Sequence, residues 1–157
     1  MTDQHAIRPL HVKRVPLGQL LKDLSLGGDI DATTEVSNIT LDSRTVVPGT
    51  LYAALPGSKV HGAQFAASAI EQGAVAILTD PQGRKILGDC EVPVLVSGDA
   101  RADTAALSAR IFGHPADKVS MIGVTGTNGK TTTVALLEAG LSACGVRVGT
   151  IGTVGFR

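Results

Sequence analysis

The stretch VSMIGVTGTNGKTT, residues 119–132, decides the fold of the C-terminal part of this chain. Residues 119–124 form an apolar run that predicts a buried strand, and residues from about 130 to 143 predict a helix. The loop between them is rich in glycine and threonine and ends in Gly-Lys-Thr-Thr. This is the context that a phosphate-binding loop requires. We therefore expect a nucleotide-binding α/β unit.

The residue types in this loop suit the binding of a nucleoside triphosphate. Gly126 and Gly129 allow backbone conformations and a close approach that a Cβ would block, so that N–H groups can point at phosphate oxygens. Lys130 can reach the β and γ phosphates, and the Thr131 hydroxyl can coordinate Mg²⁺. The general pattern would place its first glycine at Val124, so the loop is a variant. We expect ATP to contact Gly126, Thr127, Asn128, Gly129, Lys130, Thr131 and Thr132.

The residues upstream alternate between strand and helix patterns. Strands are expected over 36–41, 51–55, 74–79 and 92–96, the last near a sheet edge because Pro93 cannot donate a ladder hydrogen bond. Helices are expected over 16–24, within 61–73 and over 99–112, with Gly73 as a C-cap and Asp99 as an N-cap. Residues 80–91 are expected to be a polar loop.

Residues 114–117, His-Pro-Ala-Asp, interrupt this pattern, and we place a domain boundary near residue 116. The predicted fold class is α/β, with a small N-terminal domain over 1–116 and the start of a P-loop ATPase domain over 117–157. The second domain offers only a strand, the loop, a helix and a second strand over 146–151. A nucleotide-binding domain needs several strands. We therefore expect either a fragment or a segment that docks on something else.

Composition narrows the range of functions. The chain has 157 residues, 14 Lys and Arg against 14 Asp and Glu, 43% hydrophobic residues and 18% charged residues. A net charge of zero gives no general attraction to nucleic acid or to anionic lipid. The first residues lack the apolar core of a secretory signal, and no apolar run is long enough for a membrane span. We expect a cytoplasmic protein, in which Cys90 and Cys144 are incidental thiols.

The motifs together resemble the Mur ligases. The loop GTNGKTT resembles the ATP loop of that family, and LDSR at 41–44, VPGTLYAALPG at 47–57 and Gly62, Phe65, Ala69, Gly73 and Ala74 resemble its UDP-binding N-terminal domain. IGTVG at 151–155 is closer to the MurE branch than to the MurF branch. The resemblance implies a ligase that uses ATP and Mg²⁺ to phosphorylate a substrate carboxylate, which an amine then attacks. The MurE substrate is UDP-N-acetylmuramoyl-L-alanyl-D-glutamate, to which a third amino acid is added in peptidoglycan synthesis.

The resemblance also implies site residues. The UDP end of the substrate would contact Leu41, Ser43, Ser58, Lys59 and Val60. The catalytic residues would lie beyond Arg157, so no residue of this chain decides between meso-diaminopimelate and L-lysine as the added amino acid. The Ala- and Gly-rich sequence, with His-Gly-Ala at 61–63, favours diaminopimelate. Asp42 and Arg44 would be either a substrate clamp or structural turn contacts. His61 stands where the family commonly has Asp, and we expect a solvated loop histidine with no catalytic role there, as for His5, His11 and His114.

Three alternatives stay open at this stage. The chain could belong to a MurF-like ligase, or it could be a non-catalytic module that binds UDP or another nucleotide. It could also be a generic P-loop NTPase with no UDP-containing ligand. Binding assays with UDP and ATP separate these functions.

Overall fold

The computed structural model describes residues 12–153, 155 and 156. The expectations for residues 1–11, which include His5 and His11, and for Val154 and Arg157 lie outside these described residues. The chain divides into two compact units, Met1–Lys118 and Val119–Arg157.

The first unit is built on a five-stranded mixed sheet with the order β2-β7-β6-β5-β4. Four neighbouring strands are parallel, and the edge strand β2 runs antiparallel to β7. This sheet confirms the α/β fold class. The strands are β2 (Gly27–Asp29), β4 (Asn38–Thr40), β5 (Thr50–Ala54), β6 (Ala74–Thr79) and β7 (Val94–Val96).

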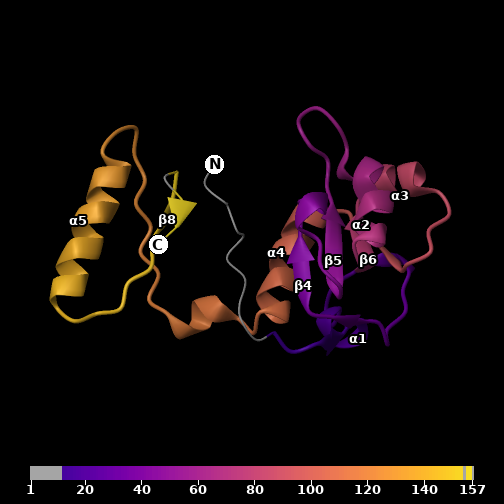
Figure 1. Cartoon of the computed structure of the whole chain (residues 1–157), viewed down its shortest axis with the longest axis horizontal. Helices are drawn as coiled ribbons and strands as arrows, with labels where there is room; N and C mark the ends of the chain where they lie inside the picture. Colours follow the sequence, from indigo (N-terminus) through magenta and orange to yellow (C-terminus); the bar gives the residue numbers. More distant parts are fainter. Residues whose placement is uncertain (1–11, 154, 157) are drawn as a thin grey trace. The chain divides into compact units, whose positions relative to one another are not determined.

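Helices cover both faces of this sheet (Figure 1). On one face, α1 (Leu17–Leu20) and α4 (Ala100–Ile111) pack on apolar side chains that include Leu51 and Leu95. On the other face, α2 (Ala66–Glu71) packs on Tyr52 and Ile77. Adjacent β5 residues thus enter opposite cores, as the alternation of side chains along a strand requires.

Several predicted elements are confirmed. Strand β6 has the expected bounds, and α4 begins after Asp99, whose carboxylate accepts a hydrogen bond from the Ala102 amide at 3.0 Å. Gly73 follows α2 with a φ of 104°, a conformation that favours glycine at the end of a helix. In the second unit, α5 (Lys130–Ala143) has the expected bounds.

Other predictions for the first unit were wrong. The helix expected over 16–24 ends at Leu20, and Asp23 has a left-handed φ of 63°. The expected loop over 80–91 contains α3 (Pro81–Leu87), because Asp80 caps it and a proline at the first helical position favours its start. Strand β7 begins after Pro93 and lies inside the sheet between β6 and β2, so Pro93 interrupts no ladder bond.

The strand expected over 36–41 is divided. β3 (Glu35–Val36) pairs with β1 (Val15–Pro16) in a separate two-stranded ribbon, whereas β4 joins the main sheet. Three short 3-10 helices complete the connections: η1 (Ser43–Thr45), η2 (Gly62–Phe65) and η3 (Pro115–Lys118).

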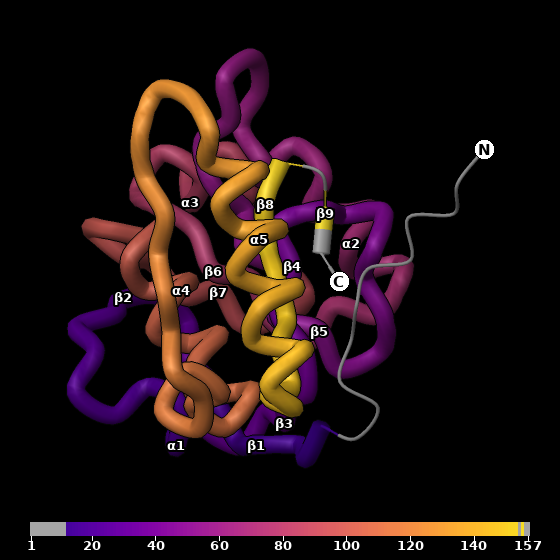
Figure 2. The backbone as a smooth tube through the Cα atoms, turned by 90° about the vertical axis from the view of Figure 1, so that its left-hand side faces the viewer, coloured from indigo at the N-terminus to yellow at the C-terminus, as the bar shows by residue number. Residues whose placement is uncertain are grey.

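The second unit does not contain the two expected strands. Residues 119–124 form no strand and run as an extended segment beside α5 (Figures 1 and 2). Of residues 146–151, only Ile151 belongs to a strand, β8 (Ile151–Gly152), which pairs with β9 (Gly155–Phe156). A strand needs a hydrogen-bonded neighbour, and the described part of this unit offers residues 119–124 none.

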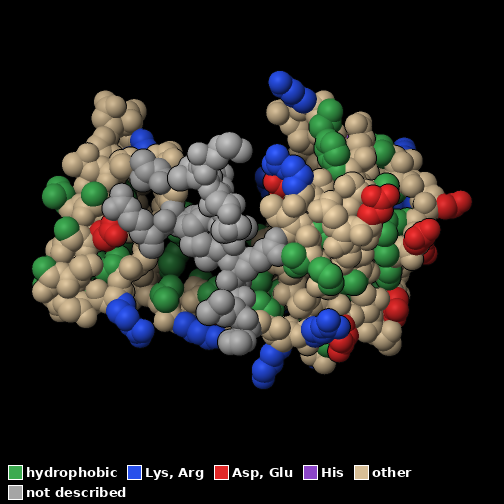
Figure 3. Space-filling model, viewed as in Figure 1, with side chains coloured by type: hydrophobic (Ala, Val, Ile, Leu, Met, Phe, Trp, Pro, Cys, Tyr) green, Lys and Arg blue, Asp and Glu red, His purple; other side chains and the backbone are tan. Residues whose placement is uncertain are grey.

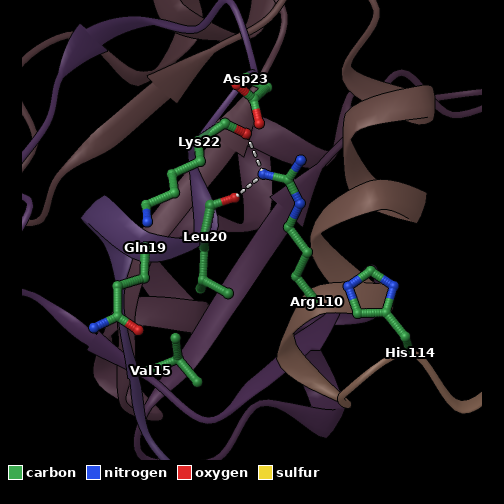
Figure 4. Close-up of a pocket in the computed structure, with 7 residues that line it drawn as sticks. All are labelled: Val15, Gln19, Leu20, Lys22, Asp23, Arg110 and His114. Atoms are coloured by element: carbon green, nitrogen blue, oxygen red, sulfur yellow. Dashed lines mark hydrogen bonds between the residues drawn. The ribbon is translucent and has the colours of Figure 1, made fainter.

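An open pocket of about 430 Å³ lies at the junction of α1 and α4 (Figure 4). Arg110 donates hydrogen bonds to the backbone oxygens of Leu20 and Lys22 there. The guanidinium thus satisfies carbonyl groups that the end of α1 leaves without helical partners. No helix among the described residues has the length and apolar character needed to cross a membrane.

Candidate functional site

The candidate UDP-binding residues lie at one edge of the sheet of the first unit. β4 and β5 are parallel neighbours, so the segments that follow them leave the sheet at the same edge. Residues 41–45 follow β4, and the loop 55–61 follows β5 and projects beyond the strands in Figure 1. Open α/β sheets bind ligands outside the carboxyl ends of their strands. The topology therefore brings the two predicted segments to the place where a ligand is expected.

The turn after β4 is held by its own hydrogen bonds. The Thr40 and Thr45 hydroxyls lie 2.8 Å apart, and the Thr45 amide donates to the Asp42 backbone oxygen at 3.0 Å. Leu41 is 55% exposed. The Ser43 side chain forms no hydrogen bond within the described part of the chain, so its hydroxyl is available to a ligand.

Asp42 and Arg44 contact each other. The Arg44 guanidinium donates to both Asp42 carboxylate oxygens, at 2.9 and 2.7 Å, and the Arg44 amide donates to the same carboxylate at 3.0 Å. The side-chain hydrogen bonds from Arg44 hold the pKa of Asp42 below its usual value. These contacts cap η1. They favour the structural interpretation of this pair over a substrate clamp.

The loop after β5 presents three of the predicted residues to solvent. Ser58, Lys59 and Val60 are exposed, and the Gly57 amide donates to the Val60 oxygen at 3.1 Å to close the loop tip. Within the described residues, the Ser58 and Lys59 side chains form no hydrogen bond or ion pair. Basic side chains stand at this end of the unit in Figure 3. The loop thus offers a cation and a hydroxyl to an anionic ligand.

His61, at the end of this loop, is not the solvated residue that we expected. Its side chain is 6% exposed, and its Nε2 lies 3.1 Å from the Asp80 Oδ1. Its Nδ1 accepts a hydrogen bond from the Ala63 amide at 3.1 Å and thereby caps η2. Because Asp80 follows a different strand, no local pattern in the sequence indicated this contact.

Tyr52 connects the sheet to the same loop. It is 1% exposed, and its hydroxyl donates to the Gly62 backbone oxygen at 3.0 Å. Burial, and secondarily the charge of Asp42, raise the pKa of Tyr52. The neutral phenol is therefore the form that supports the turn after His61.

In the second unit, the predicted ATP loop leads directly into α5 (Figure 2). Gly126 and Gly129 have φ angles of 145° and 78°, which side chains other than glycine rarely adopt. The first helical bond runs from the Thr133 amide to the Gly129 oxygen, so the amides of the preceding helical residues are without helical partners. No side chain of the described residues caps this helix. These N–H groups suit phosphate oxygens.

Lys130 folds back over the loop. Its Nζ donates to the backbone oxygen of Gly126 and to that of Thr127, the latter at 3.3 Å. The predicted ATP residues Thr127, Asn128, Thr131 and Thr132 are exposed. The lysine thus stands at the mouth of the loop, where it can exchange carbonyl partners for phosphate oxygens.

The described residues offer less to a metal ion than the predicted ATP loop offers to phosphate. Among the described residues, no group of three His, Cys, Asp or Glu side chains could hold a metal ion. Thr131 contributes one hydroxyl oxygen, a donor that suits Mg²⁺ when phosphate oxygens and water supply the other ligands.

A family model described as "Mur ligase family, catalytic domain" matches residues 35–127. The chain belongs to the Mur ligase family. The match begins at β3 and ends within the predicted ATP loop, so it includes the sheet edge and the first residues of that loop.

Individual Mur ligases show the same relationship. Over 96% of its length, the chain is 45% identical to the UDP-N-acetylmuramoyl-L-alanyl-D-glutamate–2,6-diaminopimelate ligase of Streptomyces coelicolor. It is 48% identical, also over 96% of its length, to the ligase of that name from Streptomyces avermitilis. The chain spans 29% of the length of each of these relatives.

A solved ligase structure agrees with the sequence comparison. The structure of a UDP-N-acetylmuramoyl-L-alanyl-D-glutamate–2,6-diaminopimelate ligase superposes with a TM-score of 0.67 and 26% identity. The likeness covers 92% of this chain and 29% of that one. This chain thus corresponds to less than a third of the solved ligase.

Proposed function

We propose that this chain is the substrate- and ATP-binding part of a MurE-type ligase. Such an enzyme adds 2,6-diaminopimelate to UDP-N-acetylmuramoyl-L-alanyl-D-glutamate in peptidoglycan synthesis, in the cytoplasm, where ATP is supplied. The observation that carries the proposal is the 45–48% identity to two ligases of that name over 96% of the chain. Those names favour the MurE branch over the MurF branch and diaminopimelate over lysine.

The first unit would bind the UDP end of the substrate. Ser43 and Ser58 offer hydroxyl groups that form no hydrogen bond with the described residues. Lys59 offers a charge-assisted contact to the diphosphate, and Leu41 and Val60 offer exposed apolar surface to the uracil ring. The carboxyl edge of the sheet would place these groups around one ligand.

The second unit would bind ATP. The free amides at the start of α5 and the Lys130 ammonium would hold the phosphates, and the positive φ of Gly126 and Gly129 would aim the backbone at them. Mg²⁺ bound with the nucleotide would contact the Thr131 hydroxyl and would neutralise phosphate charge. The γ-phosphoryl group would pass to the substrate carboxylate, and the amine of the incoming amino acid would then displace phosphate.

A ligation assay tests the proposal. The native gene product that contains this chain is incubated with ATP, Mg²⁺ and UDP-N-acetylmuramoyl-L-alanyl-D-glutamate, with either meso-diaminopimelate or L-lysine. We expect ATP-dependent tripeptide product with diaminopimelate and its loss in Lys130→Ala. Product with L-lysine alone would contradict the amino-acid assignment. ATP hydrolysis without any peptide product would instead favour a generic P-loop NTPase.

A non-catalytic module is the second candidate. It would bind UDP and ATP but would form no product in the same assay. The family match and the two relatives' names argue against it.

A further inference from the structure

Buried His61 and half-buried Asp80 form a polar pair at the base of the candidate UDP loop. The His61 Nδ1 accepts from the Ala63 amide, so its Nε2 carries the proton in the neutral ring and donates to the Asp80 carboxylate. The same Asp80 oxygen accepts from the Gly83 amide at 2.7 Å and caps α3. One imidazole therefore connects the base of the loop to the start of a helix that follows another strand.

The pair is placed where the two ends of the loop meet. Pro56 and His61 form an isolated antiparallel bridge, and the Gly62 amide donates to the Leu55 oxygen at 2.8 Å. By contrast, the side chains of Ser58 and Lys59 form no hydrogen bond to the described residues. The loop conformation thus depends on its backbone closure and on the anchorage of His61.

The packing around His61 leaves little freedom. A Cβ at Gly83 would lie 2.6 Å from the His61 Cε1 and 1.9 Å from the Thr79 Oγ1. Glycine at this position is therefore required for α3 to lie so close to the imidazole. The close approach of α3 in turn restricts the position of the His61 ring. A loop held in this way loses less conformational entropy when a ligand binds.

The pair also fixes one oxygen of the Asp80 carboxylate against the protein, although the carboxylate keeps its negative charge. Asp80 follows β6 at the same edge of the sheet where a diphosphate would bind, and a free carboxylate there would repel it. Hydrogen bonds from the His61 ring and the Gly83 amide direct the Asp80 Oδ1 toward the protein.

We propose that His61 and Asp80 are a positioning pair that holds the loop 56–60 in the conformation that binds the UDP end of the substrate. This inference rests on the proposed function of the first unit. Neither residue needs to touch the ligand. Exchanging the two residues should therefore preserve much of the effect, whereas either single exchange should not.

The test is UDP binding to the 157-residue chain by calorimetry, with thermal melting of each variant. His61→Asp retains an acceptor for the Ala63 amide but places two carboxylates together. Asp80→His retains an acceptor for the Gly83 amide but places two imidazoles together. The double exchange restores one histidine and one carboxylate. His114→Asn, a half-exposed histidine away from the loop, is the matched control.

We expect each single exchange to weaken UDP binding by about tenfold or more, the usual effect of losing a hydrogen bond to a charged group. The double exchange should recover most of the affinity, and the control should bind like the unaltered chain. Asp80→Asn keeps the α3 cap and a neutral acceptor, so it should fold even where the other variants do not, with a smaller loss of affinity.

Two results would overturn the inference. One is UDP affinity in folded Asp80→Asn and His61→Asp equal to that of the unaltered chain. The other is a double exchange that melts like the unaltered chain but binds UDP as weakly as the single exchanges. If the unaltered chain itself does not bind UDP, the proposed function fails, and the role of the pair in UDP binding fails with it.

Discussion

Replacement of Gly83 by alanine should destabilise the first unit, although alanine is the better helix former. Gly83 lies in α3 and is buried. The added Cβ would stand 1.9 Å from the Thr79 Oγ1, whereas unbonded heavy atoms need about 3.5 Å. α3 would have to move by about 1.6 Å, away from a hydroxyl that donates to the Ala54 oxygen.

The magnitude follows from three opposing contributions. Overpacking costs roughly 1–3 kcal/mol, and disturbance of the Asp80 cap costs about 1 kcal/mol. The helix propensity of alanine returns about 1 kcal/mol. The net loss is about 2 kcal/mol, which lowers the Tm of a domain of about 100 residues by roughly 10 °C.

Urea and thermal unfolding measure this loss. Tyr52 is the only tyrosine and the chain has no tryptophan, so tyrosine fluorescence follows the first unit. Gly98→Ala is the matched control, since no atom of the described residues lies within 4 Å of its added Cβ, and its stability should be unchanged or slightly higher. A Tm for Gly83→Ala at or above that of the unaltered chain would refute the close packing of α3 on His61 and Thr79.

Three further outcomes are expected. Ultraviolet titration of tyrosinate should give a midpoint above the ordinary value of about 10, because burial raises the pKa of Tyr52. The stability that the neutral phenol contributes should be complete below the ordinary pKa of about 10 and should decline as pH rises through the folded-state pKa. Tyr52→Phe should abolish this loss of stability at alkaline pH. A normal midpoint in the folded chain would contradict the burial of Tyr52. Arg44→Ala should change UDP affinity by less than about twofold, since Arg44 pairs with Asp42 on the surface. NMR should show the pKa of Asp42 rising toward its usual value in this variant, and a large loss of UDP affinity would restore the substrate-clamp interpretation. Gly129→Ala should weaken ATP binding by about tenfold, because a left-handed φ of 78° costs a side chain roughly 1–2 kcal/mol. Gly140→Ala, within the helix that follows, should not weaken it, and equal affinities of the two variants would show that the loop does not need this conformation.

The elements predicted well from the sequence are those with local causes. α4 follows from the Asp99 cap and its alanine-rich composition, and α5 follows a glycine whose φ permits the turn into the helix. The loop residues 126–132 also form a contiguous motif, so their order alone indicated a phosphate site. LDSR and the loop after β5 were assigned to the UDP end from the family resemblance, and the structure brings both segments to one edge of the sheet.

The failures concern contacts between residues distant in sequence, and one local signal that no apolar periodicity accompanied. His61 is buried because Asp80 reaches it from the end of another strand, and no spacing rule relates the two residues. α3 was missed because its start signal, Asp80 before Pro81, lies in a polar stretch with little apolar periodicity. Residues 119–124 have the composition of a strand, but a strand forms only beside a partner, and the described part of the second unit does not supply one.

The most direct test of the account is a crossed binding experiment on the 157-residue chain, with UDP and ATP titrated separately. The account predicts that Ser43→Ala weakens UDP binding without changing ATP binding. It also predicts that Lys130→Ala weakens ATP binding without changing UDP binding. Binding of ATP with no measurable binding of UDP would contradict the central claim that the first unit holds the UDP end of a Mur ligase substrate.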